Sequence, residues 1–149
     1  MRNKGKLIFA AIVIGVLIYI VTYPHFYEKR YYEDLDNYVT SHGVIESIFW
    51  SSSQSSVIIW MAEAHEEYNH GGALIWYPSF EIIGDSVPLV LEKEIFEKLK
   101  PGDEIVFTSA PRLFGNGDSL PIVYLEADGE VLLPFELGYE NLLDEYLFG

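Results

Sequence analysis

Residues 92–108 read EKEIFEKLKPGDEIVFT, and this stretch decides the fold. Its first nine residues place Ile95, Phe96 and Leu99 on one side of a helix, with acidic residues at the start and lysines at the end, as the helix dipole favours. The following Pro-Gly pair ends that helix, and the DEIVFT run predicts a strand. A helix this short needs a sheet to pack against. The stretch therefore predicts a helix that enters a strand through a tight turn.

Short runs rich in β-branched and aromatic residues flank this stretch on both sides, separated by serine-rich or glycine-containing turns. The region between residues 73 and 91 is interpreted as short strands or as one long bent strand. The chain ends in a run with helical spacing of apolar residues. The expected strands are residues 43–50, 57–61, 73–91, 103–108, 121–126 and 131–133, and the expected terminal helix is 137–148.

The first five strands and the helix follow the order strand, strand, strand, helix, strand, strand, which resembles that of the OB-fold, a small five-stranded Greek-key barrel. The resemblance covers residues 43–133 and rests on this order and on the Lys-Pro-Gly-Asp turn at residues 100–103. The expected fold class is mainly β with short helices: an N-terminal transmembrane helix, then an OB-like five-stranded barrel. An open antiparallel sheet with one packed helix is the alternative. The likeness is one of fold and carries no functional residues over.

An apolar segment without charge, residues 7–21, lies near the N-terminus. Eleven of its fifteen positions are Leu, Ile, Val or Phe, which contribute on the order of −3 to −7 kcal/mol to membrane insertion. We expect lipid contact at Leu7, Ile12, Val16 and Ile20. The chain then divides into a signal anchor over 1–25, a juxtamembrane helix over 26–42, and an acidic β domain with a C-terminal helix over 43–149.

The flanks of this segment favour an uncleaved anchor over a cleaved signal peptide or a buried core helix. Tyrosines and phenylalanine follow it where a cleavage site would need small residues, and aromatic rings are typical of the membrane interface. Arg2, Lys4 and Lys6 precede it, against Lys29 and Arg30 after it. This bias predicts a single-pass protein of the cell membrane, with a cytoplasmic N-terminus and an extracytoplasmic domain.

Charge is distributed unevenly along the chain. From residue 31 onward there are four basic and 22 acidic residues, a net charge of −18. Such a domain repels phosphate backbones, so nucleic acid is excluded as a partner. The negative charge of this domain has two interpretations. It keeps the domain soluble, or it attracts a basic partner. The absence of cysteine excludes disulfides, thiol catalysis and thiolate metal sites.

One polar stretch, residues 62–72, carries candidate metal ligands. His65, Glu66 and His70 lie within it, and imidazole and carboxylate are the zinc ligands left to a chain without cysteine. The two histidines are five residues apart, about 140° around a helix, so they do not form the HExxH site of zinc proteases. A loop that brings them together would bind zinc, and a solvated acidic loop is the plainer interpretation.

Aromatic residues in the second and third predicted strands are candidates for a ligand or partner surface. OB-type barrels stack ligands on such rings, which here are Trp60, Trp76 and Tyr77. Large aromatics in strands are also the usual material of a core. No motif of nucleophilic, phosphate-binding or calcium-binding chemistry occurs in the sequence, and no residue is assigned a catalytic role.

These observations lead to three functional hypotheses. The first is a membrane-tethered, extracytoplasmic, non-enzymatic binding domain that contacts lipid through its N-terminal helix and another envelope or membrane protein through its β domain, without a cofactor. The second is a zinc-binding module or metal-dependent enzyme that uses residues 62–72. The third is a structural accessory subunit of a membrane complex.

Overall fold

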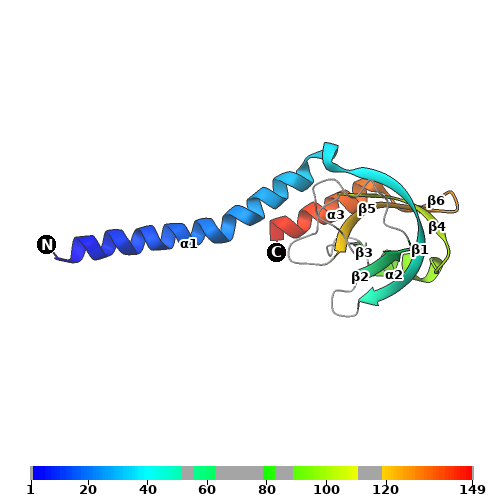
Figure 1. Ribbon diagram of the computed structural model, residues 1–149, viewed down its shortest axis with the longest axis horizontal. Helices are drawn as coiled ribbons and strands as arrows, with labels where there is room; N and C mark the ends of the chain where they lie inside the picture. Colours follow the sequence, from blue (N-terminus) through cyan, green and yellow to red (C-terminus); the bar gives the residue numbers. More distant parts are fainter. Residues whose placement is uncertain (1, 52–55, 63–78, 83–88, 111–118, 149) are drawn as a thin grey trace.

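The computed structural model describes residues 2–51, 56–62, 79–82, 89–110 and 119–148. The long N-terminal helix is followed by strands and short helices that gather into one β-rich unit (Figure 1). In chain order the elements are α1 (Arg2–Glu33), η1 (Leu35–Asn37), β1 (Val39–Ser51), β2 (Ser56–Met61), β3 (Ser79–Glu81), α2 (Leu89–Lys98), β4 (Glu104–Ser109), β5 (Ser119–Ala127), β6 (Glu130–Leu133) and α3 (Phe135–Phe148).

The strands close into a barrel. β1 pairs antiparallel with both β2 and β4, β2 pairs with β3, and β5 pairs antiparallel with β4 and parallel with β3. The ring β1-β2-β3-β5-β4 is thus complete, with α2 between β3 and β4 along the chain, and β6 is an extra strand on β5. The prediction of an OB-like five-stranded barrel is confirmed, and the open sheet is excluded by the β3–β5 pairing.

Strand β1 takes part in both halves of the barrel. Residues 39–44 pair with β4 and residues 45–51 pair with β2. The register shifts between Ile45 and Ser47, which makes Glu46 the extra residue of a bulge. A bulge bends a strand and increases its twist, and Figure 1 shows β1 curving around the barrel.

The turn that ends α2 is fixed to this same point of β1. Gly102, at a φ of +94°, donates its backbone N–H to the carbonyl of Ile45 at 2.8 Å. The N–H of Ile45 in turn donates to the carbonyl of Asp103 at 3.0 Å. Asp103 also accepts a hydrogen bond from the backbone N–H of Lys100 at 2.9 Å. The Lys-Pro-Gly-Asp turn thus attaches the start of β4 to the middle of β1, as glycine's freedom at positive φ allows.

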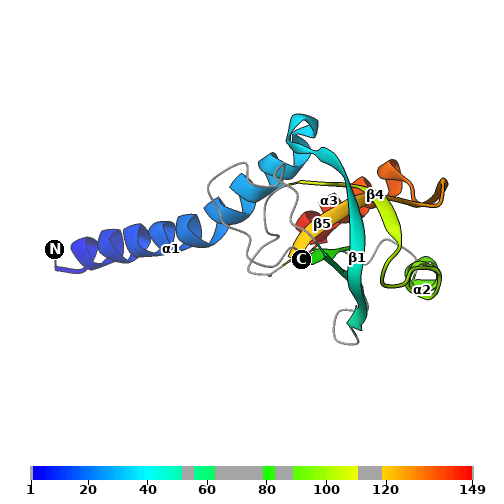
Figure 2. The same cartoon turned by 45° about the vertical axis from the view of Figure 1, so that its right-hand side comes forward.

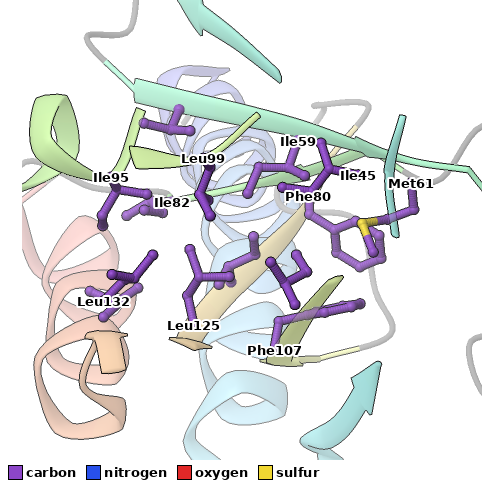
Figure 3. Close-up of a cluster of buried hydrophobic side chains, with 14 of the residues drawn as sticks. Ile45, Ile59, Met61, Phe80, Ile82, Ile95, Leu99, Phe107, Leu125 and Leu132 are labelled. Carbon is purple, nitrogen blue, oxygen red and sulfur yellow. The ribbon is translucent and has the colours of Figure 1, made fainter. Parts of the chain in front are cut away.

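Inward-facing aliphatic and phenylalanine side chains fill the barrel (Figure 3). On β2 the buried positions alternate, with Val57, Ile59 and Met61 inside. Phe80 and Phe107 meet edge to face across the interior, with their ring centroids 4.6 Å apart. Helix α2 contributes the buried side chains of Ile95 and Leu99, so the predicted apolar face of this helix is confirmed. The helix begins at Leu89 rather than at residue 92, and residues 89–91 of the predicted strand region are helical.

A second buried cluster joins the end of α1 to α3 and β5, and we call it the helix–barrel joint. Its buried members are Tyr32, Ala110, Val123 and Leu142, and its half-buried members are Tyr31, Tyr38, Phe135, Tyr139 and Leu143. Three side chains donate hydrogen bonds to carbonyls of the last helical turn: Asn37 to Tyr31 at 2.9 Å, Tyr38 to Tyr32 at 2.8 Å, and Tyr139 to Glu33 at 3.1 Å. The terminal carbonyls of a helix have no partner within it, so these bonds satisfy three of them.

Helix α1 ends at Glu33, so the expectation of a juxtamembrane helix reaching residue 42 was wrong. The helical spacing of apolar residues continues past this point, but the carbonyl caps of the joint end the helix, and β1 begins at Val39. Residues 39–44 become a strand because β4 pairs with them, at separations of 60 to 70 residues along the chain. Within the part of the chain that the structure describes, no helix combines the length and apolarity needed to cross a membrane.

Candidate functional site

An open groove of about 610 Å³ crosses the outer face of the barrel, and we call it the acidic groove. Strands β1, β4 and β5 and the β5–β6 turn contribute its walls. It is lined by His42, Gly43, Val44, Ala62, Glu104, Ile105, Val106, Glu126, Asp128 and Gly129.

The strand register explains why these side chains meet. His42 of β1 lies opposite Val106 of β4, which lies opposite Glu126 of β5. Side chains directly opposite one another on neighbouring strands share a face, with their Cβ atoms about 4.5–5.5 Å apart. His42 and Glu126 therefore flank Val106 in one row. In the next row, Val44 lies opposite Glu104.

Alternation along each strand separates the groove from the core. On β4, Ile105 and Phe107 are buried, whereas Glu104 is exposed and Val106 is half-buried. On β5, Leu125 points inward and Glu126 lies on the opposite face. The same backbone segments that build the barrel core therefore present carboxylates outward.

The β5–β6 turn forms one end of the groove. Asp128 has a φ of 51° and Gly129 a φ of 76°, and two successive positive φ values are typical of a type I′ hairpin turn. Aspartate tolerates this left-handed conformation better than most residues with a side chain. The tight turn holds Asp128 in a fixed position beside β4, since Ala127 still pairs with Ile105.

The groove is electronegative. The ion pairs Lys29–Glu33 and Lys98–Glu130 both lie outside the groove. The Tyr124 hydroxyl donates to Oε2 of Glu126 at 2.5 Å, and this hydrogen bond raises the pKa of Tyr124. The carboxylates of Glu104, Glu126 and Asp128 thus have no lysine or arginine partner in the described part of the chain.

None of the known protein-family models matches the sequence, and no curated protein or solved structure is significantly similar to it.

The predicted zinc ligands His65, Glu66 and His70 lie outside the described residues, so the zinc site stays a prediction. In the ranges that are described, no three His, Asp or Glu side chains form a group that could hold a metal ion. The carboxylates of the acidic groove are among these described residues.

The predicted aromatic surface is only partly described. Trp76 and Tyr77 lie outside the described residues. Trp60 is half-buried on β2, opposite Ser47 of β1 and Ser79 of β3, and it is not part of the lining of the groove. Its role as a partner surface stays a prediction.

A buried carboxyl group lies on β3, next to the strand pairing that closes the barrel. Glu81 of β3 is only 8% exposed and accepts a hydrogen bond from the Ser56 hydroxyl of β2. Burial raises the pKa of Glu81, while hydrogen bonds with Ser56 and Ser119 act in the opposite direction. The three residues come from β2, β3 and β5, so the group connects the strands that complete the ring. We assign it to barrel closure.

In the sequence alone, nothing marks His42, Glu104, Glu126 or Asp128 as residues of a site. The local signal is limited to the start of β4 and the end of β5, where exposed Glu104 precedes buried Ile105 and half-buried Glu126 follows buried Leu125. The sequence does not show which strands lie side by side. The row from His42 to Glu126 joins residues 84 positions apart.

Proposed function

We propose that this protein is a membrane-tethered binding domain, in which the apolar part of α1 lies in lipid and the OB-like barrel stands on the extracytoplasmic side. The observation that carries the proposal is the continuous series of exposed apolar side chains on α1 between Ile8 and Ile20. The side chain of Leu7 lies outside the described residues, whereas those of Ile12, Val16 and Ile20 are all exposed.

The exposed side chains cover every side of the helix. Successive residues of an α-helix are turned by about 100°, and large apolar residues occupy positions 12, 13, 14, 16, 17 and 18. Leu17 is 56% exposed and Ile20 is 59% exposed. A helix that is apolar all round belongs in a protein core or in a membrane, and Figure 1 shows this part of α1 extending away from the barrel.

Aromatic side chains follow directly after this series. Tyr19 and Tyr23 stack with centroids 4.9 Å apart, and Tyr23 and Tyr27 with centroids 6.3 Å apart. One turn further on, the Arg30 guanidinium lies 4.6 Å from the centre of the Phe26 ring. Tyrosine and cationic side chains of this kind favour the headgroup region. The arrangement supports a bilayer that ends near Tyr19 and a barrel beyond it.

The orientation in the proposal comes from the basic residues before the apolar series, as set out above. The helix–barrel joint then gives the barrel a defined position relative to α1, because the helix end is held by three hydrogen bonds and a buried cluster.

Flotation of the full-length protein with phosphatidylcholine vesicles tests the tether. We expect it to float with the vesicles and to resist extraction at alkaline pH. The Ile12→Lys/Val16→Lys variant should stay at the bottom of the gradient, because each lysine at the centre of a helix opposes insertion by about 2.5–3.5 kcal/mol.

The matched control is Val90→Lys/Val131→Lys, which places two lysines at exposed apolar positions of the barrel unit. It should float like the wild type. Wild-type protein that stays in the soluble fraction would refute the tether.

A further inference from the structure

We propose that the acidic groove binds a lysine- or arginine-bearing segment of a partner polypeptide. The inference rests on the proposed function in that it gives the tethered barrel its partner chemistry.

The lining of the groove combines two kinds of surface that suit such side chains. Val44 and Val106 supply an apolar floor, and Glu104, Glu126 and Asp128 supply carboxylates beside it. Val44 is 40% exposed, so the floor is open to a ligand. Lysine and arginine carry an aliphatic stem that packs on apolar surface and a charged head that stays among polar groups. Both parts of such a side chain find a matching surface here.

The charge of the groove is not balanced from within the described chain. No lysine or arginine of the described residues pairs with its carboxylates. Residues 31–149 together carry a net charge of −18. A concave acidic surface on such a domain raises the local concentration of cations and speeds their association. A cationic partner is therefore attracted to the domain as a whole and is held at the groove.

The spacing of the carboxylates favours an extended chain over a single metal ion. Calcium needs six to eight oxygens at about 2.3–2.6 Å, and the described residues contain no group of three ligands for any metal. Glu104 and Glu126 lie on neighbouring strands and in adjacent rows, and rows of one face are about 6.8 Å apart along a strand. Successive outward side chains of an extended peptide have the same spacing, so one segment reaches several carboxylates.

The groove also faces a region that a partner can reach. Figures 1 and 2 both show the β5–β6 turn at the end of the molecule opposite the N-terminus of α1. With α1 in a membrane, this end points away from the lipid, toward proteins in the aqueous phase or the outer parts of membrane complexes.

Fluorescence anisotropy tests the proposal on the full chain in detergent micelles. The probe is a labelled decapeptide in which lysine alternates with serine, and a peptide in which glutamate alternates with serine is its counterpart. We expect saturable binding of the lysine peptide alone. The Glu104→Gln/Glu126→Gln/Asp128→Asn variant should weaken this binding about tenfold or more at about 20 mM salt. These substitutions keep the side-chain shapes, and asparagine suits the positive φ of the turn.

The control variant is Glu94→Gln/Glu97→Gln/Glu140→Gln, which removes three exposed carboxylates outside the groove. It loses the same net charge, so we expect less than a twofold change. Equal weakening by both variants would mean that the overall field alone attracts the peptide, and the groove proposal would be overturned. Displacement of the lysine peptide by one equivalent of calcium would also overturn it, in favour of a metal site.

A charge-reversed variant, Glu104→Lys/Glu126→Lys, should instead bind the glutamate peptide, a gain that a misfolded protein would not show. Flotation separates this proposal from the tether. A groove variant that floats but does not bind the peptide supports both proposals, whereas a wild type that floats without binding the lysine peptide refutes only the groove.

Discussion

The barrel core and the helix–barrel joint are both buried, but different chemistry holds them together. The core consists of aliphatic side chains with Phe80 and Phe107 at its centre. The joint is rich in tyrosine, and its rings meet at centroid distances of 5.3–6.0 Å while two of its hydroxyls donate to the end of α1. The end of α1 brings unpaired backbone carbonyls into a buried environment. The joint therefore needs side chains that are largely apolar and that also donate hydrogen bonds. The core has no such requirement.

This difference predicts that the barrel carries the larger part of the stability. Replacing Phe107 by alanine removes a fully buried ring from the core and should cost about 3–5 kcal/mol of the free energy of unfolding. Urea unfolding followed by circular dichroism measures the loss. The matched control is Phe49→Ala on the same barrel, since Phe49 is 52% exposed. Equal losses at the two positions would mean that packing inside the barrel is not what stabilises it.

The joint should break with a smaller cost and leave the barrel folded. Gly138 of α3 lies so close to β5 that an added Cβ would sit 2.3 Å from the carbonyl oxygen of Val123. Gly138→Ala should therefore force α3 away from β5 and cost about 1–3 kcal/mol. Hydrogen exchange should rise in residues 32–38 and in α3, with β1 and β2 remaining protected.

Gly15→Ala is the control for this substitution, because an added Cβ there meets nothing within 4 Å. It should leave hydrogen exchange in the joint unchanged. If Gly138→Ala exposed β1 and β2 to the same degree as α3, the joint and the core would be one cooperative unit.

The smallest effect is expected at Glu81, the buried carboxyl group next to the barrel closure. Its pKa in the folded protein is raised by burial, so the folded state favours the protonated form. The stability that the protonated group contributes is present below the unfolded pKa of about 4.3 and is lost as the pH rises through the raised folded value. Glu81→Gln should therefore stabilise the protein at pH 7 by less than about 1 kcal/mol, since the serine hydrogen bonds oppose the effect of burial.

The stability gained by Glu81→Gln should be smaller at pH 4 than at pH 7. Thermal unfolding of the wild type and the variant at the two pH values measures this difference. The control is Glu46→Gln, at an exposed position of the bulge in β1, which should leave the stability unchanged at both pH values. A gain at pH 4 that equals the gain at pH 7 would remove ionisation of Glu81 as its cause.

The fold could be predicted from the sequence where local signals and tertiary structure agree. The Pro-Gly turn after the helix, the apolar face with Ile95 and Leu99, and the Asp128-Gly129 hairpin each depend on residues close together in the chain. The order of the elements then indicated the OB-like barrel. The start of β1 at Val39 could not be predicted in this way, because pairing with β4 overrides a helical spacing of apolar residues.

The candidate site was beyond prediction for a related reason. In the sequence, the notable residues are those of unusual chemistry, such as His65 and Trp60. The acidic groove instead consists of ordinary residues, Glu104 and Glu126 among them, that gain a role when neighbouring strands align them. A carboxylate on the outer side of a strand is also the usual pattern of a solvated face. Only the strand register distinguishes the acidic groove from an ordinary solvated face.

The caps at the end of α1 have a mechanical consequence. Because Asn37, Tyr38 and Tyr139 hold the last turn of the helix, α1 and the barrel turn together as a single lever. A membrane helix changes its tilt with the thickness of the bilayer around it. With α1 in lipid, as proposed, a thicker or thinner membrane would rotate the lever, and the acidic groove at its far end would point in a different direction and at a different height above the lipid.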